Sequence, residues 1–167
     1  MPFRLRAESP DFLAIAPKRW TFRGRVEAPQ EPVFDAIAAD PSTWTWFPGF
    51  SSGRYEGPGP HGIGSIREVR VGPSIYRETI VAWDRPARWV YRVDSTTVPL
   101  AHALVEEWTV EPDGNSGSRV RWTFAVDPRA MFRVLGPMTP MVLGRVFRKA
   151  MRNLEAELRT RASREPA

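Results

Sequence analysis

The sequence predicts an α+β domain in which a curved, seven-stranded antiparallel sheet wraps around a long C-terminal helix. Three observations predict this fold. Residues 20–28 alternate between apolar and polar side chains, as a half-buried strand does. Residues 51–128 contain six further strand-like segments, separated by turn residues. Residues 143–158 then repeat apolar side chains at steps of three and four, which is the period of a helix with one buried face.

One strand and two short helices begin the domain. The strand over residues 20–28 is followed by residues 29–41, whose apolar side chains recur at helical spacing, with acidic residues in the first turn and Pro41 as a stop. Residues 42–50 are rich in tryptophan and phenylalanine and predict a second helical turn that ends at Pro48 and Gly49.

Six consecutive strands form the body of the sheet. Glycine, proline, asparagine and aspartate occupy the separators, and residues 113–117 predict a hairpin loop. Strands joined by such short turns pair as an antiparallel meander. The six segments are residues 51–57, 64–72, 74–83, 87–96, 101–112 and 118–128.

The long C-terminal helix is expected to begin near Thr139 and to fray after Ala162. A kink or separate short turn is expected over residues 129–136. The helix carries one apolar stripe and is the one long amphipathic element that could cover the apolar face of the sheet, so a sheet that curls around it is predicted. The stripe consists of Leu143, Phe147, Met151, Leu154 and Leu158.

Length and composition fit one domain over residues 18–162, with an N-terminal extension over residues 1–17 and a frayed tail over residues 163–167. The absence of cysteine excludes disulfides and thiolate chemistry. The apolar stretch at residues 12–16 is too short for a signal peptide or a membrane span. A cytoplasmic protein without membrane insertion is therefore expected, as a monomer or a homodimer.

The net charge of +5 does not indicate a nucleic-acid partner, because the basic excess lies at the two ends of the chain. Residues 28–144 carry eleven basic and thirteen acidic side chains. Residues 57–62 match the spacing of a dinucleotide-binding motif, but two prolines interrupt them and a strand follows instead of a helix. With two histidines and no cysteine, no metal site is expected, and no cofactor is expected either.

Between residue 18 and about residue 160, five segments resemble in order and spacing the START/Bet v 1-like (SRPBCC) superfamily, and within it the polyketide cyclase/dehydrase and lipid-transport branch. The resemblance implies a helix-grip fold, with a cavity between the sheet and the last helix and an entrance near the two short helices. Members of this family include ligand carriers, cyclases, aromatases and sensors, and the resemblance implies no fixed catalytic set. The segments are VEAPQEPVFDAIAADPSTWTWFPGF, GPGPHGIGSIREV, DRPARWVYRV, EEWTVEPDGNSGSRVRWTF and RVFRKAMRNLEAEL.

The inner face of the sheet is predicted to be rich in aromatic side chains. Strand parity places on this face Trp20, Phe22, Val26, Trp89, Tyr91, Val93, Leu104, Glu106, Trp108, Val110, Val120, Trp122, Phe124 and Val126. At least half of this set is expected to fill the core. Trp44, Trp46 and Phe47 are expected near the entrance, where they would pack on the helix or close over a ligand. The candidate ligand contacts are Trp44, Trp46, Phe47, Arg77, Trp89, Tyr91, Leu104, Trp108, Trp122, Phe124, Met138 and Val142.

Glu106 is the most informative polar residue, because it shares its parity with Leu104 and Trp108 and is predicted to be buried. A buried carboxylate must be paired or have a raised pKa. Glu106, His102 on the same parity, and Tyr91 are the candidate catalytic residues. The alternative is that Glu106 bonds a tyrosine or an arginine structurally and that His102 lies at a loop rim.

The register of residues 75–83 stays open, because either parity places one charged side chain inside, Glu78 or Arg77. An inward Arg77 would pair with Glu106 or with an acidic or enolate-like group of a ligand.

Three functions are consistent with the sequence. The first is binding of a small hydrophobic or aromatic molecule, polyketide-like or lipid-like, in the internal cavity. The second is a cofactor-independent polyketide cyclase, aromatase or dehydratase, which would use acid–base residues in that cavity. The third is a regulatory protein-interaction module with a filled interior and the basic face of the last helix as its contact surface.

Overall fold

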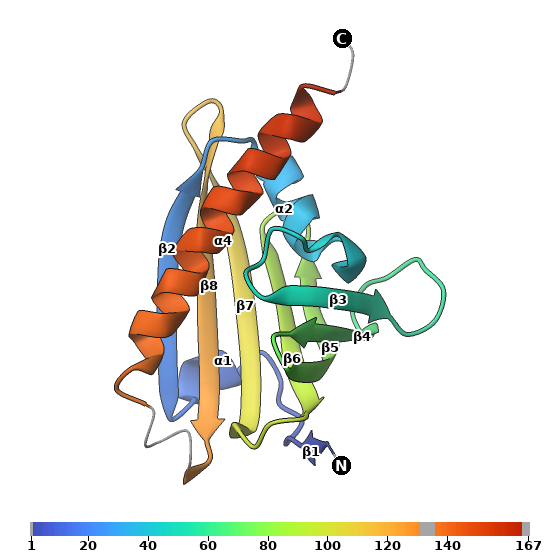
Figure 1. The fold of residues 1–167 in the computed structure, drawn as a ribbon, viewed down its shortest axis with the longest axis vertical. Helices are drawn as coiled ribbons and strands as arrows, with labels where there is room; N and C mark the ends of the chain where they lie inside the picture. The colour runs from blue at the N-terminus through green and yellow to red at the C-terminus, as the bar shows by residue number, and fades with distance from the viewer. Residues whose placement is uncertain (1, 131–135, 165–167) are drawn as a thin grey trace.

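The computed structural model describes residues 2–130 and 136–164. It confirms the predicted class, with an antiparallel sheet curved around the C-terminal helix α4 (Thr139–Ala162) (Figure 1). The sheet order is β2-β8-β7-β6-β5-β4-β3, so the six strands β3 to β8 form the predicted meander. Strand β2 pairs with β8 at the end of this order. The strands are β2 (Lys18–Val26), β3 (Phe50–Tyr55), β4 (Ile66–Val71), β5 (Ser74–Asp84), β6 (Arg88–Thr96), β7 (Ala101–Asp113) and β8 (Gly117–Pro128).

An eighth strand, β1 (Phe3–Arg4), was not predicted from the sequence. It pairs with the end of β6, where Phe3 lies opposite Thr96. The pairing of β6 with β7 ends at Arg92, so the last residues of β6 have a free edge there. The N-terminal segment fills this edge and satisfies backbone groups that would otherwise need water.

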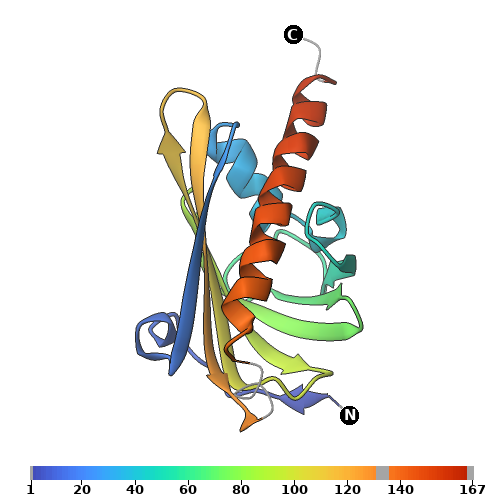
Figure 2. The same ribbon diagram turned by 60° about the vertical axis from the view of Figure 1, so that its left-hand side comes forward.

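The N-terminal segment also covers part of the outer face of the sheet. Helix α1 (Phe12–Ile15) buries Phe12 and Leu13 against a small apolar cluster on that face. Figure 2 shows α1 on the side of the sheet opposite α4. The sheet therefore has buried apolar side chains on both of its faces where α1 packs against it.

Two short helices follow β2, as predicted. Helix α2 (Gln30–Ala38) packs its apolar face into the main core. The second is the 3-10 helix η1 (Pro41–Thr43), which begins one residue before the range 42–50 predicted for this turn and ends within it. The Asp40 side chain accepts a hydrogen bond from the Ser42 backbone N–H at 2.8 Å, and Pro41 follows it, so this short polar sequence fixes the start of the helix.

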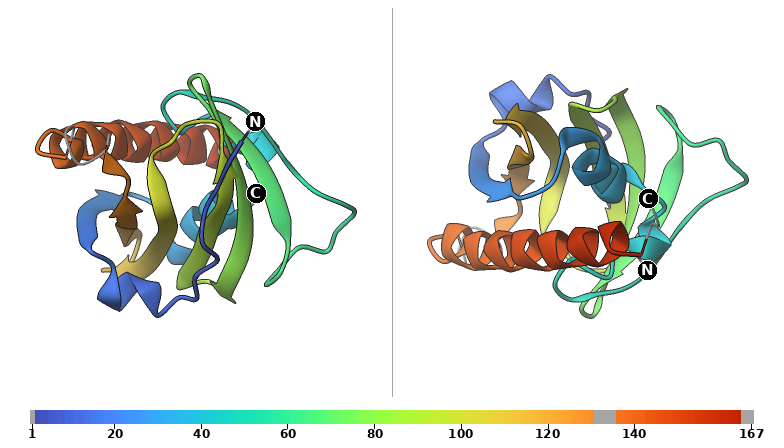
Figure 3. Two further views of the ribbon diagram at one scale, coloured as in Figure 1. Left: turned by 90° about the horizontal axis from the view of Figure 1, so that it is seen from below. Right: turned by 90° about the horizontal axis from the view of Figure 1, so that it is seen from above.

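The concave side of the sheet holds the main core together with α2 and α4 (Figure 3). Trp108 and Trp122 stack at 5.4 Å between ring centroids, and Phe147 of α4 packs on both. The core includes the inward-facing residues that alternation predicted on β6, β7 and β8. The predicted kink or turn over residues 129–136 lies mostly outside the described residues.

Helix α4 lies very close to β2, because position 24 is a glycine. A Cβ atom at Gly24 would lie 3.1 Å from side-chain atoms of both Met151 and Phe147. Glycine permits this close approach of backbone and helix. No helix within the described ranges is long and apolar enough to cross a membrane.

Candidate functional site

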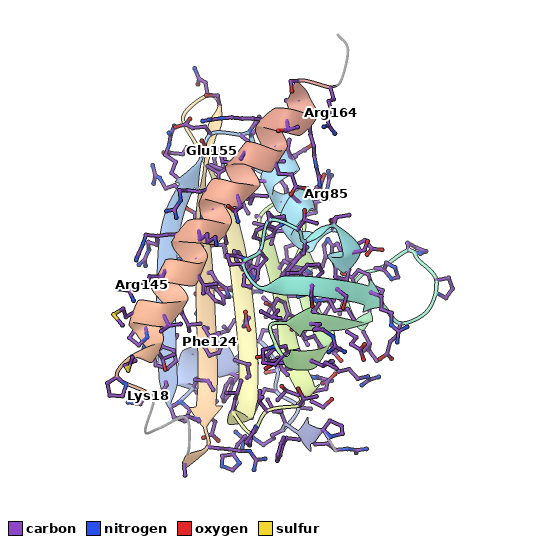
Figure 4. All side chains as sticks on the ribbon, in the orientation of Figure 1. Lys18, Arg85, Phe124, Arg145, Glu155 and Arg164 are labelled. Atoms are coloured by element: carbon purple, nitrogen blue, oxygen red, sulfur yellow. The ribbon has the colours of Figure 1, made fainter. Side chains whose placement is uncertain are left out.

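A cavity of about 180 Å³ lies between the concave face of the sheet and the N-terminal half of α4. Strands β4 to β8 contribute its walls, and β2 contributes none of its lining. Figure 4 shows Phe124 of β8 beside this half of α4. The lining consists of Trp44, Phe47, Pro48, Val69, Val71, Tyr76, Glu78, Tyr91, Leu100, Leu104, Glu106, Trp122, Phe124, Leu143 and Val146.

Seven residues singled out from the sequence come together at this cavity. They include two of the three aromatic side chains predicted near the entrance and the carboxylate predicted to be buried. They are Trp44, Phe47, Tyr91, Leu104, Glu106, Trp122 and Phe124.

Trp46, Trp89 and Trp108 were expected to contact a ligand, and the structure places them elsewhere. All three are fully buried and none lines the cavity. Trp46 packs edge-on against Trp108 at 6.1 Å between ring centroids. Trp89 and Trp108 fill the core, because a strand's inward parity holds for its whole length whereas the cavity spans only part of it. Trp46 lies in the turn between η1 and β3 and packs into the same core.

Met138 and Val142 were also expected at the ligand and are instead exposed, at 57% and 47% of their surface. Met138 precedes α4 as its N-cap residue, and Val142 lies beside the buried stripe on the side that faces solvent. Leu143 of that stripe and Val146 beside it line the cavity in their place.

The structure decides the open register of β5 in favour of an inward Glu78. Arg77, expected as a ligand contact, points outward and donates two hydrogen bonds to Glu56 at 2.7 and 2.9 Å. Glu78 is buried and lies directly opposite Arg67 of β4. The inward parity is fixed by this partner on the neighbouring strand.

Arg67 is the main polar residue of the site that sequence reasoning missed. It is fully buried, and its Nε donates to Glu78 Oε2 at 2.6 Å. Its guanidinium lies 4.4 to 4.6 Å from the ring centroids of Trp44, Trp89 and Tyr91. Such contacts stabilise a cation in a site with little water. Arg67 shares its strand parity with Val69 and Val71, so alternation along residues 66–71 was the available signal.

Glu106 is buried beside this ion pair and remains 9% exposed. Its Oε2 atom accepts hydrogen bonds from the Tyr91 hydroxyl and from Trp122 Nε1, both at 2.7 Å. Burial and the nearby Glu78 raise the pKa of Glu106 to about 7, although the two hydrogen bonds oppose the shift. Burial and Glu106 raise the pKa of Tyr91 well above 10, so its hydroxyl stays a neutral donor at physiological pH.

Two alternatives were open for His102, a catalytic position on the parity of Glu106 and a position at a loop rim. Its side chain is exposed and does not line the cavity. The pairing of β7 with β8 shifts register between Ala101 and Ala103, and such a bulge breaks the alternation on which the expectation rested. Among the residues with described positions, no three histidine, aspartate or glutamate side chains gather as metal ligands.

Comparison with known sequences gives the family. The sequence profile described as "Polyketide cyclase / dehydrase and lipid transport" matches residues 19–159. The chain belongs to this family. The resemblance noted from the five sequence segments is thereby confirmed for the START/Bet v 1-like superfamily and this branch of it. A search of curated proteins found no significant match.

Solved structures of other proteins have the same fold. A START superfamily protein from Mycobacterium smegmatis has a TM-score of 0.71 at 12% identity, covering 85% of this chain and 97% of its own. The Zhui aromatase/cyclase from Streptomyces sp. R1128 has a TM-score of 0.71 at 16% identity, covering 87% and 95%. The major latex-like protein 151 from Panax ginseng has a TM-score of 0.67 at 12% identity, covering 84% and 96%. At these identities the likeness shows the fold.

Proposed function

We propose that the chain binds a small aromatic or otherwise mostly apolar molecule in the cavity between the sheet and α4. The observation that carries the proposal is the lining itself. Six aromatic side chains and several aliphatic ones surround a space that has two carboxyl groups on its wall. Mostly apolar pockets with a few placed polar groups are typical of small-molecule sites.

The volume of the cavity narrows the size of the ligand. At about 180 Å³ it is slightly larger than the cavity of about 150 Å³ that holds a benzene molecule. A single ring with short substituents fits within this space, and a larger ligand would have to extend out of its open side. The presence of a cavity also favours ligand binding over an interaction module with a filled interior.

Blocking the cavity tests this proposal. We expect Val146→Trp to weaken binding of p-cresol or p-xylene at least tenfold, because the new ring would enter the space that Val146 lines. Val142→Trp is the matched control, since Val142 lies one turn earlier on α4, is exposed and does not line the cavity. Tryptophan fluorescence would follow the titration, because Trp44 and Trp122 line the site. Wild-type protein that binds neither probe, or equal affinities in the two variants, would contradict the proposal.

A second candidate function is proton transfer on a bound carbonyl compound, which is the step that a cyclase or dehydratase requires. Glu106 favours it, because a general base acts best when its pKa lies near the working pH. The ionised carboxylate would take a proton from the carbon next to the carbonyl. The electron pair of the broken C–H bond would form the enolate, and the carboxylic acid would return a proton in the next step.

Deuterium exchange tests this second function without knowledge of the natural substrate. In D2O, we expect the protein to exchange the methyl protons of acetophenone faster than buffer alone, and we expect Glu106→Gln to bring the rate to that of buffer. Glu107→Gln is the control, because Glu107 pairs with Arg88 and does not line the cavity. Proton NMR measures the rate, and an unchanged rate in Glu106→Gln would remove Glu106 from the mechanism.

A further inference from the structure

The two carboxyl groups on the cavity wall are not equivalent. Glu78 is ion-paired with Arg67. Glu106 has no cationic partner within 4.0 Å among the residues whose positions are described. Glu106 is therefore the negative group available to a ligand.

The neighbours of Glu106 hold it in one orientation. Tyr91 and Trp122 both donate to its Oε2 atom, and no hydrogen bond from the described part of the chain reaches its Oε1 atom. Because Glu106 lines the cavity and remains 9% exposed, Oε1 is the acceptor left for a bound molecule. A ligand that brings a hydrogen-bond donor would satisfy it.

The cation of the site is not accessible to a ligand. Arg67 is fully buried, does not line the cavity, and lies over the rings of Trp44, Trp89 and Tyr91. An anionic ligand group in the cavity would therefore face the Glu106 carboxylate without contact with the guanidinium. In a site with little water, such like charges repel strongly.

We infer that the cavity selects one-ring aromatic molecules that carry a neutral hydrogen-bond donor, such as a phenolic hydroxyl, and that it rejects aromatic carboxylates. The inference rests on the proposed ligand-binding function and names the ligand class of the same cavity. Glu106 Oε1 accepts the hydrogen bond from the donor of the ligand. Tyr91 and Trp122 are positioning residues that hold the carboxylate in place.

Three probes of similar size test the inference in the wild-type protein at pH 7.5. They are p-cresol, p-xylene, in which a methyl group replaces the hydroxyl, and p-toluate, which is anionic. An apolar cavity without a polar contact would prefer p-xylene, because the hydroxyl of p-cresol loses its water on burial. We expect p-cresol to bind at least tenfold more tightly than p-xylene, since a hydrogen bond to a charged acceptor is among the stronger ones. We expect p-toluate to bind at least tenfold more weakly than p-cresol.

Two variants assign the preference to Glu106. In Glu106→Gln, the amide oxygen can stay on Tyr91 and Trp122 while the amide NH2 replaces the acceptor Oε1, so the preference for p-cresol over p-xylene should fall below threefold. In Glu107→Gln, the preference should stay as in wild type, because Glu107 does not line the cavity.

The outcomes separate the inference from the function on which it rests. Equal or tighter binding of p-xylene, equal binding of p-toluate, or a preference that survives Glu106→Gln would overturn donor selection and leave ligand binding intact. If none of the three probes binds, both the proposed ligand binding and the inferred donor selection are wrong.

Discussion

Arg67→Met is expected to lower the free energy of unfolding by about 3–5 kcal/mol, because it leaves the buried Glu78 carboxylate without its partner. The aromatic rings that surround the guanidinium cannot replace the ion pair, since their faces attract cations and not anions. Urea denaturation at pH 7 measures the change, and the slope of the transition shows whether both proteins unfold in the same manner.

Two further variants test whether the loss of stability comes from the burial of the Arg67–Glu78 ion pair. Arg85→Met removes an arginine that is half exposed and pairs with Asp35, so its cost should stay below about 1 kcal/mol. The double variant Arg67→Met, Glu78→Met should recover most of the loss, because no buried charge remains. A cost for Arg67→Met as small as that for Arg85→Met would show that the buried pair does not stabilise the fold.

Glu106→Gln is expected to change how stability depends on pH. The pKa of Glu106 is raised from 4.5 to about 7 in the folded chain, so the folded protein holds this proton more tightly than the unfolded chain. By linkage, the contribution of Glu106 is most favourable below about pH 4.5, falls as the pH rises to 7, and is constant above that. A difference of about 2.5 pKa units corresponds to about 3 kcal/mol.

A comparison of Glu106→Gln with the wild type isolates the contribution of the Glu106 carboxyl group to stability. The stability of Glu106→Gln relative to wild type should rise by about 3 kcal/mol between pH 4.5 and pH 8, because glutamine does not ionise. Thermal or urea denaturation at constant ionic strength would measure it at each pH. Parallel stability profiles for the two proteins would show that Glu106 ionises as it does in the unfolded chain.

Periodicity predicted the parts of the fold whose side chains repeat without interruption. The meander from β3 to β8 and the start of α4 at Thr139 follow from alternation, turn residues and the apolar stripe. The strand β1 could not be predicted, because two residues carry no pattern and its place depends on a free edge of β6.

The candidate site was predicted where parity alone decides it. Tyr91, Glu106 and Trp122 follow from alternation, and both Tyr91 and Trp122 donate a hydrogen bond to Glu106. The register of β5 depends instead on a cross-strand ion pair, and the position of His102 depends on a bulge. Both are contacts between distant parts of the chain, and periodicity along one strand does not report them.

The close contact at Gly24 also bears on how ligand size could evolve in this fold. Helix α4 lies directly on β2 at this glycine and bounds the cavity further toward its N-terminus through Leu143 and Val146. Position 24 thus acts as a spacer between helix and sheet. A larger side chain there would press on the Met151 and Phe147 side chains of α4, the helix that also supplies Leu143 and Val146 to the cavity wall. A position outside the cavity lining thus bears on the packing of the helix that bounds the cavity.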